Sequence, residues 1–429
     1  MRVGILTLHA QTNYGAVLQA YALKSAIADM GHDVRVIDRW RDDDCARLKG
    51  ILASRSPMAW LRWLKAAVSY TGVVAELRRR LATMRFIREN LNLTDYHFRY
   101  WKDAPRDMGL DVIVVGSDQV WNAVNLVPAD YLLKETPPGL PGIAYAASIG
   151  MTAIPDELRQ DYCEGFRRFK AIAVRERTAA KMVADCGSHA EVVVDPTLLV
   201  PRSFWDRFKP ATPPARRYVT CCFLLEDIDA MKSTFRRFTA EANVDIEMFV
   251  GGYWRWPTLN PEKIRKNRKD FRKWREAGVR LRLAAGPAEF AESIAGSSGV
   301  VTNSYHALLF SLIYGKNVRV MQASDPSRRV MSAKFDEAAT FVKGPLFVKS
   351  LEAGLAGAVS GEEVRIDENV LGERVEFSRR WLEKALQTVA NHSHSRTSAT
   401  AFRGDAATSN SSGGTPHANT ATTVSESRI

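Results

Sequence analysis

Short apolar runs alternate with amphipathic stretches along the first half of the chain. Residues 3–8 form an apolar run that is typical of a buried strand, and apolar positions then recur at helical spacing until Gly31. A second apolar run over 32–38 completes a strand–helix–strand unit. Further strands are predicted at 111–116, 143–148, 171–176 and 190–195. Residues 1–200 are therefore expected to form a doubly wound, Rossmann-like α/β domain.

Prolines interrupt this alternation in the middle of the chain. They stand at Pro196, Pro201, Pro210, Pro213 and Pro214, a density that is hostile to helix interiors and central strands. A linker is therefore predicted over 201–216.

The strand and helix patterns resume beyond the linker. Strands are predicted at 217–225, 244–250, 279–284, 299–301 and 317–321. Residues 217–387 are thus expected to form a second Rossmann-like α/β domain that ends in helices. Two such domains facing each other across a cleft correspond to a glycosyltransferase-B-like architecture.

The composition changes after Gln387. Residues 388–429 consist largely of Ser, Thr, Ala, Asn and Gly and show almost no apolar periodicity. Such a segment cannot bury enough apolar surface to offset the entropy lost on ordering, so a disordered polar tail is predicted.

The cysteines and the apolar runs bear on the cellular compartment. The five cysteines are odd in number and scattered, so the sequence predicts neither a disulfide framework nor a metal site. No window approaches the roughly 18 uninterrupted apolar residues of a spanning helix. The N-terminal apolar run is interpreted as a strand and not as a signal peptide, because polar residues follow it at once. A cytoplasmic protein is expected.

The charge balance implies an anionic partner. The formal net charge is +12, from 60 basic and 48 acidic residues. By charge alone the candidate partners are a phosphorylated donor, a lipid-phosphate acceptor, the anionic inner face of a membrane and nucleic acid. Segment 60–88 combines an apolar helical stripe with arginines, and 262–282 is also strongly basic. Each is either a peripheral membrane contact or an ordinary helix face. No nucleic-acid recognition motif is present, so no nucleic-acid partner is expected.

Polar residues follow the first predicted strand. Asn13 and Gly15 stand where the carboxyl end of that strand meets a helix start, and backbone amides at such a place can hold an anion. A tight turn with a helix cap is the alternative. We assign Asn13 and Gly15 to the acceptor side of a site.

A second polar cluster follows the strand at 111–116. It contains Ser117, Asp118, Gln119 and Trp121, and ligands in open α/β sheets bind outside the carboxyl ends of the strands. A carboxylate, an amide and an indole together suit a sugar acceptor. Alternatively, Asp118 only caps a following turn.

The stretch 300–316 carries a candidate base. A predicted strand runs into Asn303 and Ser304 as helix caps, which puts His306 in the first helical turn. A helix N-terminus attracts anions and favours the neutral imidazole, so His306 is suited to general-base work beside a phosphate or carboxylate. A buried or capping histidine is the alternative.

Six stretches together resemble the polysaccharide pyruvyl transferase family. They are NYGAVLQAYAL, GSDQVWN, IAYAASIG, AVRERTA, VVDPTLLV and TNSYHALLFSLIYGK, in this order over about residues 1–345. The resemblance implies a glycosyltransferase-B-like fold, phosphoenolpyruvate as donor without a further cofactor, and a sugar product that bears pyruvate as a ketal. By motif, Arg175 and His306 match positions that the family associates with donor binding and catalysis. Tyr305 and Ala307 depart mildly from the Phe and Gly that the family usually has.

The chemistry of that donor agrees with the basic residues. Phosphoenolpyruvate carries a carboxylate and a phosphate, which guanidinium groups bind in bidentate fashion. The candidate arginines near predicted strand ends or helix starts are Arg175, Arg177, Arg328 and Arg329. Arg177 is alternatively a solvated helix residue, and only one of Arg328 and Arg329, taken as Arg328, is expected to face the cleft. Asn303 and Ser304 are assigned to the donor side as well. His306 is the expected base, Asp118 is the next candidate, and no acid is assigned.

Three functions compete at this point. The first is pyruvyl transfer to a cell-surface glycan or its lipid-linked precursor, as in exopolysaccharide biosynthesis. The second is a nucleotide-sugar-dependent glycosyltransferase of the same architecture, and the third is a non-catalytic basic glycan-binding protein. The six family stretches favour the first.

Overall fold

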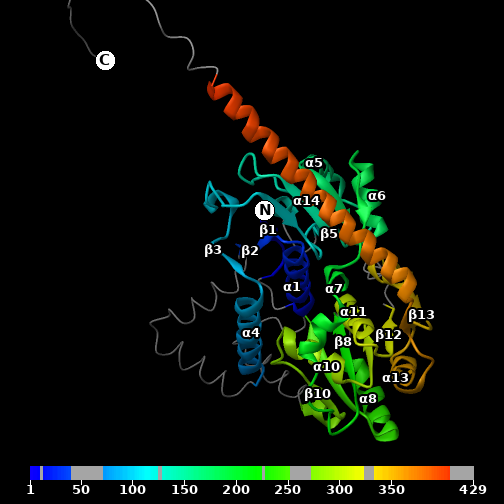
Figure 1. Cartoon of the computed structure of the whole chain (residues 1–429). Helices are drawn as coiled ribbons and strands as arrows, with labels where there is room; N and C mark the ends of the chain where they lie inside the picture. The colour runs from blue at the N-terminus through cyan, green and yellow to red at the C-terminus, as the bar shows by residue number, and fades with distance from the viewer. Residues whose placement is uncertain are drawn as a thin grey trace, which may run out of the picture.

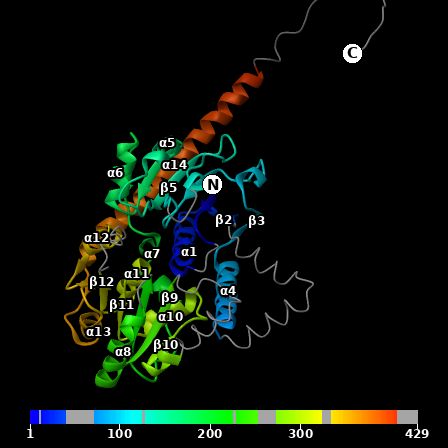
Figure 2. The ribbon, with the colours of Figure 1, turned by 180° about the vertical axis from the view of Figure 1, so that it is seen from behind.

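Two parallel β-sheets with their helices form two domains that lie one above the other (Figures 1 and 2). The computed structural model describes residues 1–9, 13–39, 71–123, 128–224, 228–251, 272–322 and 333–405. Within this part of the chain the predicted pair of doubly wound α/β domains is confirmed. None of its helices has the length and apolar character that crossing a bilayer requires.

The first sheet is wholly parallel and has the strand order β3–β2–β1–β4–β5–β6–β7. Its strands are β1 (Arg2–Leu6), β2 (Asp33–Arg39), β3 (Leu93–Phe98), β4 (Val112–Val115), β5 (Gly142–Ala147), β6 (Phe169–Val174) and β7 (Glu191–Val192). Every residue of β4 and β5 is buried, as expected for parallel strands covered on both faces. The strand order reverses between β1 and β4, so their carboxyl ends flank the crevice where such sheets bind ligands.

Helices accompany this sheet along the chain. They are α1 (Tyr14–Asp29), α4 (Thr71–Asn90), α5 (Asp156–Phe166) and α6 (Arg177–Asp185), with short 3-10 turns η1 (Trp101–Asp103) and η2 (Pro128–Tyr131). The first of them, α1, starts directly beyond the carboxyl end of β1 and reaches the second domain. There the ring of Tyr14 stacks on Phe290 at 5.0 Å and meets the edge of Phe249 at 5.8 Å.

The second sheet repeats the arrangement with the order β10–β9–β8–β11–β12–β14. Its strands are β8 (Tyr218–Leu224), β9 (Asp245–Gly251), β10 (Val279–Leu281), β11 (Gly299–Thr302), β12 (Val318–Met321) and β14 (Phe347–Val348). Its helices are α8 (Ile228–Ala242), α10 (Pro287–Gly296), α11 (Tyr305–Ile313), α12 (Ala333–Ala339) and α13 (Leu351–Ser360), and β13 (Val342–Lys343) pairs antiparallel with β15 (Arg365–Ile366). Here the order reverses between β8 and β11. Helix α11 follows β11, so its N-terminus points into the second crevice.

Part of the proline-rich connection is helical and packs against both domains. It contains α7 (Pro196–Leu199) and the 3-10 helix η3 (Arg202–Phe208). Trp205 is completely buried, and its ring packs edge-on against Tyr21 of the first domain and Phe310 of the second. Only the stretch from Lys209 onward has the exposed character expected of a linker over 201–216.

The last helix, α14 (Glu368–Asp405), returns from the second domain to the first (Figure 1, orange to red). Ser378 Oγ accepts a hydrogen bond from the Val194 amide at 3.1 Å, and Arg379 donates to the Leu199 carbonyl at 3.2 Å. Val389 is buried, and the helical backbone continues to Asp405. The prediction of a disordered tail from 388 is therefore wrong for 388–405, and 406–429 lie outside the described residues.

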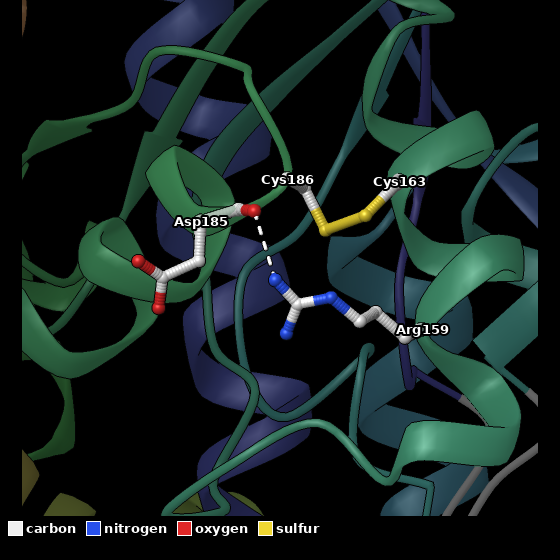
Figure 3. The surroundings of a disulfide bond; sticks show 4 residues. All are labelled: Arg159, Cys163, Asp185 and Cys186. Carbon is white, nitrogen blue, oxygen red and sulfur yellow. Dashed lines mark hydrogen bonds between the residues drawn. A yellow bond between two sulfur atoms is a disulfide. The ribbon is translucent and has the colours of Figure 1, made fainter.

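A disulfide joins α5 to the end of α6 (Figure 3). Cys163 and Cys186 are bonded with their Cα atoms 4.8 Å apart, whereas Cys221 and Cys222 are buried and free. Beside the disulfide, Arg159 of α5 donates to the Asp185 carbonyl at 3.0 Å. The expectation that the cysteines form no disulfide is thus corrected. Helices α5 and α6 flank β6 in the chain, and the fold brings together two cysteines that lie 23 positions apart in sequence.

Candidate active site

Buried charged side chains gather where the two domains meet. Arg175 follows β6, Asp118 follows β4, and Asp195 caps the N-terminus of α7, all in the first domain. His306 lies in the first turn of α11, in the second domain. Strand ends and helix starts from both sheets therefore supply one cluster of ionisable groups, at the position that parallel α/β sheets use for ligands.

Arg175 lies at the centre of this cluster. Its guanidinium Nη1 is 3.1 Å from Asp195 Oδ2, and its other nitrogens are 3.7 Å from carboxylate oxygens of Asp118 and Glu176. The side chain is only 1% exposed. Burial opposes the charge, but Tyr305 and the three carboxylates together raise the pKa of Arg175, so the group stays charged. These carboxylates offset the charge of the guanidinium, although only Asp195 is within hydrogen-bond distance of it.

Asp195 connects Arg175 to the candidate base. Its Oδ1 accepts from the amide and hydroxyl of Thr197 at 3.0 and 2.9 Å, which fixes the carboxylate as the helix cap. Its Oδ2 faces Arg175 and lies 3.6 Å from Nε2 of His306. Although burial raises the pKa of Asp195, His306 and Arg175 outweigh it and hold that pKa well below the usual value. An ionised carboxylate thus lies beside an imidazole nitrogen that has no hydrogen-bond partner within the described part of the chain.

His306 packs against the N-terminus of α1. A Cβ atom placed on Gly15 would lie 2.1 Å from His306 Nδ1, far inside normal contact. Gly15 therefore makes room for the imidazole. Asn13 caps α1, because its Oδ1 accepts from the amides of Gly15 and Ala16 at 3.1 and 3.4 Å. Asn13 is therefore a helix cap, as the alternative interpretation of the sequence expects. The assignment of Asn13 and Gly15 to acceptor binding stays a prediction.

Tyr305 links two basic groups at the cluster. Its ring centroid is 4.5 Å from Arg175 Cζ and 5.9 Å from Lys334 Nζ, and it meets the His306 ring at 5.6 Å. Lys334 belongs to α12 and is only 7% exposed. Sequence reasoning missed it, because α12 follows His306 by more than 20 residues and no strand end or glycine marks the position. A lone lysine within an amphipathic stretch carries no signal of burial.

The segment after β4 is used mainly for packing. Asp118 adopts a left-handed conformation with φ of 73°, which aims its carboxylate at Arg175. Ser117 is completely buried, its hydroxyl donating to the Ala146 carbonyl at 2.9 Å and its amide to Gln19 Oε1 at 3.0 Å. Gln119 is half-buried and accepts from Asn122 at 3.3 Å.

Trp121 does not face the cluster. Its indole is completely buried, donates to the Tyr131 carbonyl at 3.1 Å, and packs edge-on against Phe166 and Phe169. Because no part of the ring is exposed, it cannot stack on a sugar in this structure. The same burial removes Ser117 from direct contact with an acceptor. Both acceptor assignments are corrected: Trp121 packs in the core beside α5, and Ser117 is buried between Gln19 of α1 and the Ala146 carbonyl.

The remaining predicted donor residues divide by position. Arg177 is 73% exposed and pairs with Glu337 at 3.3 Å, as the solvated alternative expects. Asn303 and Ser304 lie half-buried at the start of α11, where the Ser304 amide donates to Thr302 Oγ1 at 2.8 Å. Arg328 lies outside the described residues. Among the described residues no group of three or more His, Cys, Asp or Glu could hold a metal ion.

Comparison with known proteins identifies the family. A model of the polysaccharide pyruvyl transferase family matches residues 13–324. No curated protein gives a significant sequence match. The fold is similar to that of UDP-N-acetylglucosamine 2-epimerase from Rickettsia bellii, with 10% identity, a TM-score of 0.49, and coverage of 91% of this chain and 97% of that one. It is also similar to alpha,alpha-trehalose 6-phosphate synthase from Burkholderia multivorans, with 11% identity, a TM-score of 0.46, and coverage of 92% and 98%.

The family match covers most of the chain. It includes the part of the charged cluster that lies between β4 and α11. Asp118, Arg175, Asp195 and His306 all fall within it, on elements from both domains. The chain therefore belongs to the polysaccharide pyruvyl transferase family.

Proposed function

We propose that this protein transfers pyruvate from phosphoenolpyruvate to two hydroxyls of a glycan or its lipid-linked precursor, forming a ketal. The observation that carries the proposal is the Asp195–His306 pair, buried where the two domains meet, with Nε2 and Oδ2 3.6 Å apart. Such a transfer needs a base for the attacking hydroxyl, and His306, beside the ionised Asp195 and within the matched segment, is the candidate.

The reaction assigns a separate job to each member of the pair. A sugar hydroxyl attacks C2 of the donor while C3 gains a proton, and His306 takes the proton of that hydroxyl. Asp195 stabilises the resulting imidazolium, because its carboxylate stays ionised. A second hydroxyl then attacks C2, the bond from C2 to the phosphate oxygen breaks, and phosphate leaves with the second hydroxyl proton.

Arg175 is best explained as a positioning residue in this scheme. It is buried, and it holds Asp195 at 3.1 Å and Asp118 at 3.7 Å. This places the carboxylate that orients His306. Direct contact of Arg175 with the donor remains a prediction, since its side chain is only 1% exposed.

The experiment is a comparison of His306→Gln with His189→Gln, a control at a histidine whose side chain is 83% exposed. Phosphate release that depends on phosphoenolpyruvate is measured together with the mass gain of one pyruvate ketal on the glycan. His306→Gln is expected to lower turnover by about 100- to 10,000-fold, with little change in donor affinity by calorimetry. Normal turnover of this variant would remove the assignment. Nucleotide-sugar hydrolysis without dependence on phosphoenolpyruvate would support a glycosyltransferase instead.

We also propose a peripheral contact with an anionic membrane, where a lipid-linked acceptor resides. The outward face of α4 carries Leu77 and Leu81, which are 41% and 60% exposed, with the exposed Arg78, Arg85 and Arg88 beside them. Leucine side chains that enter the lipid interface and arginines that meet its phosphates are the two parts of an interfacial helix. The rest of the predicted segment 60–88, residues 60–70, lies outside the described residues.

The membrane contact is tested by sedimentation with vesicles. Wild-type protein is expected to bind vesicles that contain phosphatidylserine and not neutral phosphatidylcholine vesicles, and Leu77→Ser with Leu81→Ser to weaken this binding. Equal sedimentation with both vesicle types would contradict the proposal.

A further inference from the structure

Helix α12 places a buried lysine at the edge of the charged cluster. Lys334 is 7% exposed, and its Nζ is 5.9 Å from the ring centroid of Tyr305. Within the described part of the chain its ammonium has ring contacts with Tyr305 and Phe335 and no hydrogen bond or ion pair. Buried lysines are ordinarily paired, because an unpaired buried ammonium is costly. Buried charged groups that destabilise the fold in this way are typical of functional sites.

Charged groups reach Lys334 from several elements. Arg175 beyond β6 has the same charge, whereas Asp118 beyond β4 and Glu176 have the opposite charge. Glu337, one turn further along α12, is engaged with Arg374 at 2.6 Å. Burial, and after it Arg175, lowers the pKa of Lys334 to about 8. Near neutral pH the ammonium therefore predominates but gives up its proton readily.

Lys334 and His306 border the same aromatic side chain. The His306 ring is 5.6 Å from the Tyr305 ring, and the Lys334 ammonium is 5.9 Å from it. His306 lies 3.6 Å from the ionised Asp195, which favours gain of a proton, whereas the Lys334 ammonium can only donate. The pyruvyl transfer proposed above needs one acid and one base, and such a pair lies next to Tyr305, at 5.6 and 5.9 Å from its ring centroid.

We propose that the Lys334 ammonium is the acid that delivers a proton to C3 of the enolpyruvyl donor. The proposal rests on the proposed function. An N–H bond of Lys334 breaks, and the electron pair of the C2–C3 double bond forms the new C3–H bond. C2 is then attacked by the oxygen of the sugar hydroxyl, whose proton passes to His306. Lys334 regains a proton from the imidazolium through solvent, so both groups return to their starting forms.

The test compares Lys334→Met, Lys334→Arg and Lys334→Ala, with Lys181→Met as a control at a lysine whose side chain is 75% exposed. Both Lys334→Met and Lys334→Arg are expected to lose about 100- to 10,000-fold in turnover, because arginine keeps the charge but does not release its proton. Calorimetric affinity for phosphoenolpyruvate should change little. Turnover of wild-type protein should fall as pH rises past about 8, since the acid must be protonated. In Lys334→Met this alkaline decline should be absent.

Chemical rescue covers the case in which a variant is merely misfolded. Ethylamine added to Lys334→Ala should restore part of the turnover, and across a series of amines the rescued rate should follow the amine pKa. Full turnover of Lys334→Arg, or a loss confined to donor affinity, would show that only the charge is needed and would overturn the proposal. A wild-type protein that releases no phosphate from phosphoenolpyruvate would instead refute the proposed function.

Discussion

Gly15→Ala offers a sharp test of the site, because Gly15 touches His306 across the two domains. A Cβ at this position would lie 2.1 Å from Nδ1, 2.3 Å from Cγ and 2.8 Å from Cβ of His306. Ordinary contact begins at 3.4 Å, so the imidazole would have to withdraw by about 1.3 Å. The backbone of Gly15 lies in a region that alanine also adopts, so the steric effect acts alone. A displacement of about 1 Å in a catalytic group costs roughly 100-fold in rate, which is the expected loss of turnover.

The assay is steady-state phosphate release, with thermal melting to confirm folding. Gly372→Ala is the matched control, because a Cβ on this helical glycine meets nothing within 4 Å. It should leave turnover unchanged and raise stability by up to about 1 kcal/mol through helix propensity.

A double variant separates displacement of His306 from a general disturbance. If Gly15→Ala acts through the imidazole, adding it to His306→Ala should cost little further turnover, since the group it displaces is already gone. Additive losses in the double variant, or normal turnover of Gly15→Ala alone, would refute the reasoning.

Three further predictions concern stability. Arg175→Lys should lower turnover and also destabilise the fold by up to about 3 kcal/mol, because the planar guanidinium that faces three buried carboxylates is lost. An unchanged melting temperature would contradict the stabilising role of this buried cluster. Trp121→Ala should cost about 3 to 5 kcal/mol of unfolding free energy by urea titration while calorimetric donor affinity stays the same in the folded protein. Cys163→Ser should abolish the difference in stability between oxidised and reduced protein, which loop entropy puts at about 3 kcal/mol in the wild type.

The sequence was most informative where burial is continuous. β4 and β5 are buried at every position, and uninterrupted apolar runs predicted both. β3 was missed because it lies at the edge of the sheet and mixes polar with apolar residues. The predicted end of the ordered chain at residue 387 falls within α14, because the sequence gives no sign that Val389 is buried against another part of the molecule. Local pattern predicts an element, whereas the partner that stabilises it comes from the fold.

The candidate site follows the same rule. His306 was placed correctly in the first turn of α11, since a strand and cap residues precede it. The motif cannot say which way a side chain points, so Trp121 was assigned to a sugar although it lies in the core. Lys334 and Asp195 were not singled out, because their roles depend on neighbours that are remote in the chain.

The course of α14 has a mechanical consequence. The chain passes between the domains twice, once through η3 and once on the way from α13 to α14. A body tethered at two points can turn only about the line that joins them, so any opening for substrate entry is expected to be a hinge rotation about these crossings. Asp195 and Gly15 lie in one body and His306 in the other, so opening would part the imidazole from its carboxylate. The Asp195–His306 pair would then be assembled only when the two domains are closed.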